Sequence, residues 1–163
     1  MLTIAEVDAF LNTTKRAVSA IDWRPGLSRK DVQWWSVDCA IEVNGTIPEG
    51  ARIILQWRPD VGSATEKYSC GLLYRNERVY GLDFSPDTQH TNKVGRGRQY
   101  FGSRFGPGTH VHTWSVEGQG YAEPIENFSD FGAMFDFFCI RTKLNVEGGF
   151  RRPPAQQLSL GLL

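Results

Sequence analysis

All three histidines of the chain lie within 23 positions of one another, at His90, His110 and His112. His110 and His112 alternate with Val111, and alternate residues of a β-strand share a face. We therefore expect two imidazoles on one surface, with Trp114 on the same side. Imidazole can transfer protons or bind a metal near neutral pH. Two partly exposed histidines on an open sheet face remain the plainer interpretation of a short His-x-His motif.

The histidines belong to a stretch, Thr88–Val116, that contains no Asp or Glu. Cations and aromatic rings are interleaved along it. Arginine can form paired hydrogen bonds with phosphate oxygens, and aromatic rings can stack on unpaired bases. This mixture predicts a nucleic-acid-binding surface made of Lys93, Arg96, Arg98, Tyr100, Phe101, Arg104 and Trp114. The alternative is a solvated loop whose arginines pair with acids elsewhere in the chain.

Asp83 precedes this stretch on a predicted strand, on the face opposite Leu82 and Phe84. A carboxylate that accepts a hydrogen bond from an imidazole fixes its tautomer and raises its basicity. Asp83 is therefore a candidate to orient a histidine in acid–base catalysis. Pairing of Asp83 with a nearby arginine is an equally good interpretation.

His110 and His112 are followed by Glu117 with the His-x-His-x4-Glu spacing of the first cupin motif, which suggests a divalent transition metal. The match is partial, because Arg104 replaces the usual glycine. Cupins also supply a later histidine, whereas this chain has none after Trp114 and is expected to turn helical there. The predicted catalytic site, His110, His112, His90 and Asp83, therefore contains no metal and no cofactor, and a cupin-like metal site is kept as an alternative.

The surrounding pattern predicts an α+β domain. Capping-box spacing at Thr3–Glu6 and apolar residues at helical intervals predict a first helix over residues 4–20. Alternating patterns and turn residues predict an antiparallel sheet of about five strands, at 35–43, 52–58, 67–74, 78–84 and 110–116. A long loop covers 85–109, and a second, Phe-rich helix is expected between Ser129 and Asn145. Residues 1–150 form one domain, with an extended tail over 151–163.

The amino-acid composition limits the classes of partner and the cellular compartment that we expect for this protein. Lys plus Arg and Asp plus Glu both number 18, so no whole-molecule field favours nucleic acid or an anionic membrane, and any such footprint has to be local. The three separated cysteines lie among apolar neighbours, which indicates buried thiols of a reducing compartment. The chain shows no signal-peptide pattern and no membrane span. We therefore expect a cytoplasmic protein with no membrane partner.

Three segments carry a family resemblance, namely Val79–Pro86, His90–Lys93 and Gly106–His112. They resemble a little-characterised group of small bacterial proteins in which a strand ending in Asp leads to a His-x-Asn loop and a Gly-Pro-His-x-His strand. Related members include TumE-like toxins of toxin–antitoxin modules. Here Gly108-Thr109 lengthens the final motif. The resemblance implies a role in bacterial defence or on a mobile genetic element, with RNA as substrate and a protein antitoxin as partner.

The leading hypothesis is a toxin-like protein that acts on RNA as a metal-independent endoribonuclease. His110 and His112 would transfer the protons, Arg96 or Arg98 would bind phosphate, and His90 and Asp83 would assist. The second hypothesis is a non-catalytic phage or mobile-element inhibitor that binds a nucleic acid or a target protein through the loop 93–105. The third is the cupin-like metalloenzyme. The sequence leaves the oligomeric state open.

Overall fold

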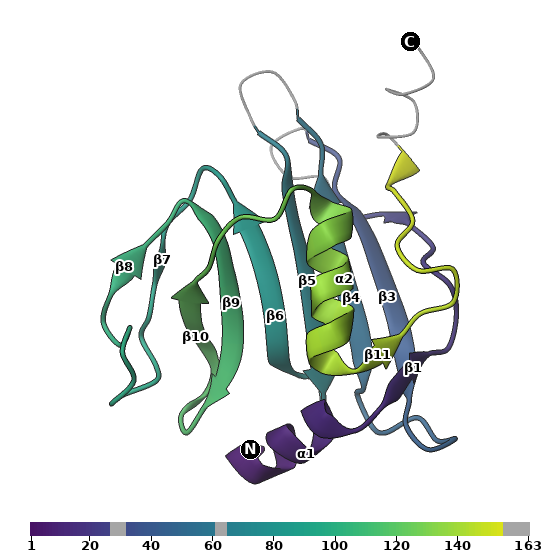
Figure 1. Ribbon diagram of the computed structural model, residues 1–163, viewed down its shortest axis with the longest axis horizontal. Helices are drawn as coiled ribbons and strands as arrows, with labels where there is room; N and C mark the ends of the chain where they lie inside the picture. The colour runs from purple at the N-terminus through teal and green to yellow at the C-terminus, as the bar shows by residue number, and fades with distance from the viewer. Residues whose placement is uncertain (27–31, 61–64, 155–163) are drawn as a thin grey trace.

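A computed structural model describes residues 1–26, 32–60 and 65–154 of the chain. The described part contains two helices and a large sheet (Figure 1). Its elements, in chain order, are α1 (Ile4–Asn12), β1 (Lys15–Ala17), β2 (Arg24–Pro25), β3 (Trp35–Glu42), β4 (Arg52–Arg58), β5 (Lys67–Tyr74), β6 (Glu77–Ser85), β7 (His90–Thr91), β8 (Arg104–Phe105), β9 (Gly108–Ser115), β10 (Gly118–Pro124), α2 (Phe131–Thr142) and β11 (Leu144–Asn145).

The α+β class is confirmed, but the expected number of strands was wrong. In the described residues nine strands form one sheet, in the order β10-β9-β6-β5-β4-β3-β1-β11 with β2 also paired to β3. Neighbours are antiparallel except β1 and β11, which run parallel. The extra strands are short, apart from β10. Two-residue and three-residue strands have no alternating pattern long enough to be recognised in a sequence.

The first helix is shorter than predicted. It begins at the expected capping box, where Glu6 N–H donates to Thr3 Oγ1 and the Glu6 carboxylate accepts from the Thr3 backbone, but it ends at Asn12 instead of residue 20. Lys15–Ala17 then forms β1, which pairs with both β3 and β11. Val18, which lies within the predicted helix, is 42% exposed. The long-range pairing of β1 overrides the helical spacing.

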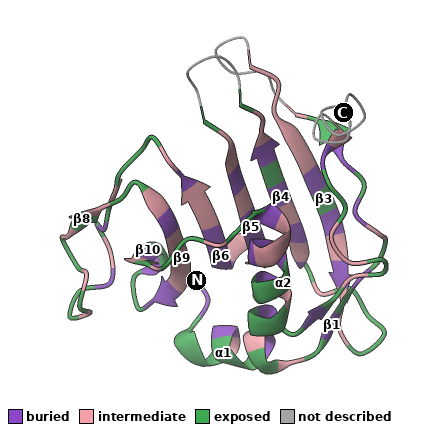
Figure 2. Ribbon diagram, turned by 45° about the horizontal axis from the view of Figure 1, so that its top comes forward, coloured by how far each residue is buried: buried purple, intermediate pink, exposed green. Residues whose placement is uncertain are grey.

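Helix α2 confirms the second predicted helix and covers the sheet. Its N-cap is Asp130, which accepts a hydrogen bond from Ala133 N–H, and its inward residues Phe131, Met134, Phe135 and Phe138 are buried. Phe131 stacks on Tyr68 of β5, and Tyr80 of β6 contacts Phe138. Figure 2 shows exposed residues along the outer sides of both helices and buried ones along the strands. The main core therefore lies between α2 and the centre of the sheet.

The segment after β6 departs from the sequence expectations. The predicted loop 85–109 contains a small hairpin, in which His90 of β7 pairs with Phe105 of β8. The chain was expected to turn helical after Trp114, but β10 follows and pairs with β9 along the sheet edge. From residue 155 on, the expected extended tail lies outside the described residues. None of the helices in the described ranges has the length and apolar character needed to cross a membrane.

Candidate functional site

The face of the sheet that carries the predicted catalytic residues is polar. Side chains from neighbouring strands stand side by side along it, because Gln56 pairs with Ser69, Ser69 with Asp83, and Asp83 with His110. The opposite face of the same strands presents Tyr80, Leu82 and Phe84 toward the apolar side, as the alternation predicts. Antiparallel register therefore places Asp83 directly beside His110.

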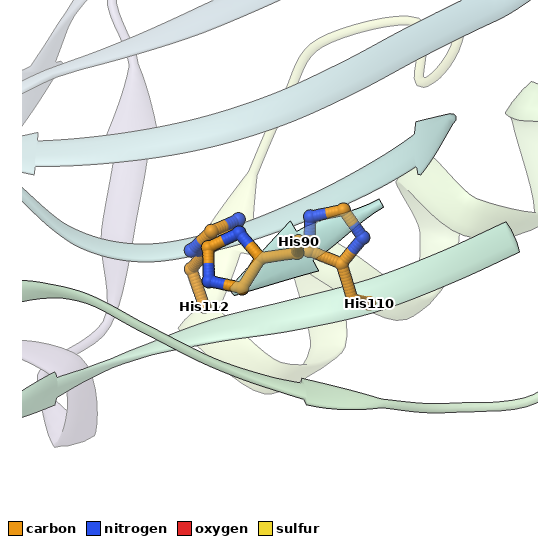
Figure 3. A group of neighbouring side chains, drawn as sticks. All are labelled: His90, His110 and His112. Carbon is orange, nitrogen blue, oxygen red and sulfur yellow. The ribbon is translucent and has the colours of Figure 1, made fainter. Parts of the chain in front are cut away.

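The three histidines converge on this face (Figure 3). His110 and His112 extend from β9, and His90 reaches them from β7. The ring centroids of His110 and His112 lie 4.8 Å apart, and that of His90 lies 5.3 Å and 5.2 Å from them. One nitrogen from each ring lies within 4.8 Å of the other two. Three imidazoles separated by 22 positions in sequence thus form one cluster.

Asn92 fixes His90 in the cluster. It is 2% exposed and joins the hairpin to β10, since its Nδ2 donates to the carbonyls of Tyr100 and Ala122 while its Oδ1 accepts from Ala122 N–H. These three bonds set the orientation of the amide. The same Oδ1 lies 3.0 Å from His90 Nε2, which must then carry the proton. His90 Nδ1 is left with a free lone pair.

Asp83 contacts both histidines of β9. Its Oδ2 lies 2.9 Å from His112 Nε2 and 3.6 Å from His110 Nε2. At 2.9 Å the two atoms are within hydrogen-bond distance, but the His112 N–H is not well aligned with the carboxylate. The same carboxylate also pairs with an arginine. Asp83 therefore contacts both kinds of partner that were considered for it, a histidine and an arginine.

That arginine is Arg78, which sequence reasoning missed. Its two terminal nitrogens reach both oxygens of Asp83, at 2.6 Å and 3.2 Å, and Nη2 also donates to the Cys70 carbonyl. The guanidinium lies over Gly81, beside its cross-strand partner Gly71. Two paired glycines inside strands were the available signal, because they mark close approach of another group to the backbone.

The charges of this cluster are set by burial and by Arg78. Burial opposes ionisation of Asp83, but Arg78 and His112 outweigh it and hold the pKa of Asp83 well below its usual value. Burial lowers the pKa of His110 to about 4, against the opposing attraction of Asp83. Burial also lowers the pKa of His112, again against Asp83. At neutral pH the cluster thus holds an ionised carboxylate next to two neutral imidazoles of β9.

A pocket of about 310 Å³ opens onto the cluster. His90, His110, Asp83 and Arg78 line it together with Trp34, Gln56, Lys67 and Ser69. Lys67, which also lines the pocket, takes part in none of the ion pairs of the described residues. The sequence alone also did not identify the pocket residues Lys67, Ser69 and Gln56. Their position beside the histidines depends on cross-strand register.

None of the predicted nucleic-acid residues lines the histidine pocket. Arg98 bonds to the Trp114 carbonyl and to Glu123 and stacks on Tyr121, while Arg96 lies over Phe101. Trp114 was expected beside His112, but it is buried in the core with its Nε1–H bonded to the Leu2 carbonyl. Tyr100 is half-buried against Phe105, and Lys93 and Arg104 are exposed.

Glu117 of the cupin-like motif lies away from the histidines. It sits in the turn between β9 and β10, where its carboxylate accepts the backbone N–H groups of Gly95 and Arg96. The spacing of His110, His112 and Glu117 therefore does not form a shared ligand set. The third histidine of the cluster comes from upstream, at His90, and not from a later strand.

The donor set of the cluster fits a divalent transition metal. Metal-ligating histidines usually give their other N–H to a carboxylate or carbonyl oxygen, as His90 does to Asn92 and as Asp83 is placed to receive from His112. Nitrogens bound to zinc at about 2.0–2.1 Å lie about 3.4 Å apart in a tetrahedral site. The longest separation, 4.8 Å, therefore has to shorten by about 1.4 Å before the three nitrogens can share one ion. Comparisons of the chain with protein-family models, with curated proteins and with solved structures each found no match.

Proposed function

We propose that this protein is a metal-assisted phosphodiesterase that acts on RNA. The observation that carries the proposal is the convergence of His90, His110 and His112 within 4.8 Å at a pocket that also holds an unpaired lysine. Three imidazole ligands with an open fourth position are a common catalytic arrangement for zinc. A bound ion of this kind supplies Lewis acidity and lowers the pKa of a coordinated water.

The residues around the cluster suit a phosphodiester. Lys67 lies on the pocket wall and can neutralise a non-bridging phosphate oxygen, while Ser69 and Gln56 offer hydrogen bonds beside it. Arg78 is held by Asp83 and the Cys70 carbonyl, so its role is to stabilise the ionised Asp83 beside the histidines and not to bind substrate. RNA as the substrate class comes from the resemblance of the histidine segments to TumE-like toxins.

A two-histidine acid–base mechanism is less well supported by the same geometry. Such a mechanism needs one protonated imidazole to donate to the leaving oxygen. Burial lowers the pKa of both His110 and His112, which favours neutral rings at pH 7. Neutral rings can act as bases or as metal ligands, but they are poor acids. A metal ion, in contrast, needs ligands that are already deprotonated.

The test combines metal analysis with an RNA cleavage assay. We expect the purified protein to bind one zinc or cobalt ion, with His90→Ala, His110→Ala and His112→Ala each losing the ion and the cleavage of a structured RNA. Glu117→Ala is the matched control, since Glu117 contacts backbone N–H groups outside the cluster. It should retain both properties.

The outcomes separate the hypotheses. If metal-free protein cleaves RNA at full rate and His110→Ala abolishes this activity, the mechanism is histidine acid–base catalysis and not metal catalysis. Metal bound in the expected ratio without RNA cleavage would retain the centre and remove RNA as its substrate. Loss of metal in Glu117→Ala would support the cupin-like ligand set, in which Glu117 binds the ion.

A further inference from the structure

A second and larger pocket lies at the other end of β9. It measures about 1040 Å³ and lies between α1, the C-terminal end of α2 and the loop 95–98, with Tyr80, Thr113 and Trp114 among its lining residues. We call it the α1–α2 groove. It shares no lining residue with the histidine pocket. Small-ligand sites usually measure about 300–1,000 Å³, so the groove is at the upper end of that range.

The groove lies where the helical layer is incomplete. Helix α2 crosses the centre of the sheet in front of β4 and β5, and α1 lies across one end, which leaves the strands on the β9 side without a covering helix (Figure 1). Apolar side chains are left exposed along its rim, with Ile140 75%, Val116 81% and Ile4 45% exposed. Such grouped exposed apolar residues mark interaction sites more often than scattered ones do.

The charges around the groove are predominantly positive. Arg96, Arg98, Arg141 and Lys143 line it, against Asp8 and Glu117. The Glu117 carboxylate already accepts two backbone N–H groups, and Arg98 is paired with Glu123. Arg96 and Arg141 join no ion pair among the described residues. Positive charge at a rim favours an acidic partner, because complementary charges raise the association rate and exclude like-charged partners.

We propose that the α1–α2 groove binds an acidic amphipathic helix of a partner protein. The apolar face of that helix packs beside α2 on Ile140 and Val116, completing the helical layer over β6 and β9, and its flanking acidic residues pair with Arg96 and Arg141. Helix-in-groove recognition uses apolar anchors at i, i+3 or i+4, and i+7. This binding surface does not depend on the chemistry of the histidine pocket.

The test is a selection of helical peptides on the full-length protein. A displayed library of randomised amphipathic helices is panned against the wild type, and enriched sequences are measured against Arg96→Glu/Arg141→Glu. The matched control is Arg16→Glu/Arg24→Glu, which makes the same charge change at exposed positions outside the groove. Thermal unfolding of each variant reports on its fold, independently of the histidine pocket.

We expect the selected peptides to carry Asp or Glu beside an apolar face and to lose at least about tenfold in affinity for Arg96→Glu/Arg141→Glu. The control variant should bind them as the wild type does. Three results overturn the proposal: no peptide enriched, peptides without an acidic preference, or peptides that bind both variants equally. If sedimentation shows a dimer and Ile140→Glu dissociates it, the groove instead binds a second copy of the chain.

Discussion

The guanidinium of Arg78 occupies the space that a Cβ atom on Gly81 would fill. A Cβ built at this glycine would lie 2.2 Å from Arg78 Nη2, well inside van der Waals contact. Arg78 cannot simply swing aside, because Asp83 and the Cys70 carbonyl hold it. The absence of a side chain at Gly81 therefore positions Arg78, which in turn keeps Asp83 ionised beside His110 and His112.

Gly81→Ala should consequently weaken the histidine site as well as the fold. The new methyl group displaces the guanidinium, so Asp83 loses its main counter-charge. We expect a loss of about 1–3 kcal/mol in the free energy of unfolding and a loss of about 10–100-fold in zinc affinity. Denaturant unfolding and a zinc titration measure the two effects.

Gly71→Ala is the matched control for that change. Its Cβ would lie 3.3 Å from Arg78 Nε, a contact that a shift of a few tenths of an ångström relieves. Its effects should be several-fold smaller. Equal losses at Gly71 and Gly81, or none at Gly81, would show that the position of Arg78 does not control the site.

Acid should destabilise the metal-free protein between pH 6.5 and 4. The pKa of His110 falls from 6.5 to about 4 on folding, so in this range the unfolded chain binds the proton and the folded chain does not. Stability that is present above pH 6.5 is then lost on acidification, on the order of 3 kcal/mol. The lowered pKa of Asp83 adds a further loss below its usual value of 3.8.

The measurement is the free energy of unfolding from pH 7 to pH 4 in the presence of a chelator. His110→Asn removes one titrating ring and should reduce the dependence, while His112, whose pKa burial also lowers, accounts for the remainder. If the unfolding free energy of His110→Asn falls with acid as steeply as that of the wild type, other groups cause the acid sensitivity.

Regular elements with long patterns could be predicted from the sequence. Strands β4, β5 and β6 and helix α2 appear close to their expected positions, because alternating or helically spaced apolar residues run along each of them. The pairing of β1 with β11 joins residues 15–16 to 144–145, and no local pattern reports contacts at such separation. The Ile4–Ala20 prediction failed for this reason.

The candidate site could be predicted only in part. The alternation of His110 and His112 placed both rings on one face, and Asp83 was identified on the neighbouring strand. The approach of His90 depends on the β7–β8 hairpin and on the buried Asn92, whose contacts are long-range. The Arg-rich loop faces the other pocket through Arg96 and Arg98, since loop direction depends on contacts that a local charge pattern does not contain.

Lys15 should be important for stability and not for the site. It is 1% exposed, and its Nζ donates to the carbonyls of Leu11, Thr13 and Thr142, so it joins the ends of α1 and α2. Burial lowers the pKa of Lys15 to about 8, which leaves it mostly protonated at pH 7. Lys15→Met removes three donors at once and should cost about 2–4 kcal/mol of unfolding free energy.

Lys143→Met is the comparison for Lys15→Met. Lys143 is exposed and donates one hydrogen bond, to the Asn12 carbonyl, so its loss should cost less than about 1 kcal/mol. Thermal or denaturant unfolding measures both variants, and zinc affinity should be unchanged in each. Similar stabilities of the two variants would contradict the structural role of Lys15.

Asn92→Asp should loosen the hairpin that carries His90 without a change in side-chain shape. The Nδ2 group that donates to the Tyr100 and Ala122 carbonyls becomes a carboxylate oxygen, which those carbonyls repel. We expect a cost of about 2–4 kcal/mol in unfolding free energy, faster hydrogen exchange over residues 93–105 and about 10–100-fold weaker zinc binding. Gln99→Glu makes the same amide-to-acid change at an exposed position of the same loop and should leave all three properties intact. Wild-type exchange rates and zinc affinity in Asn92→Asp would mean that His90 is held by its ring contacts with Phe105 and His110 and not by Asn92.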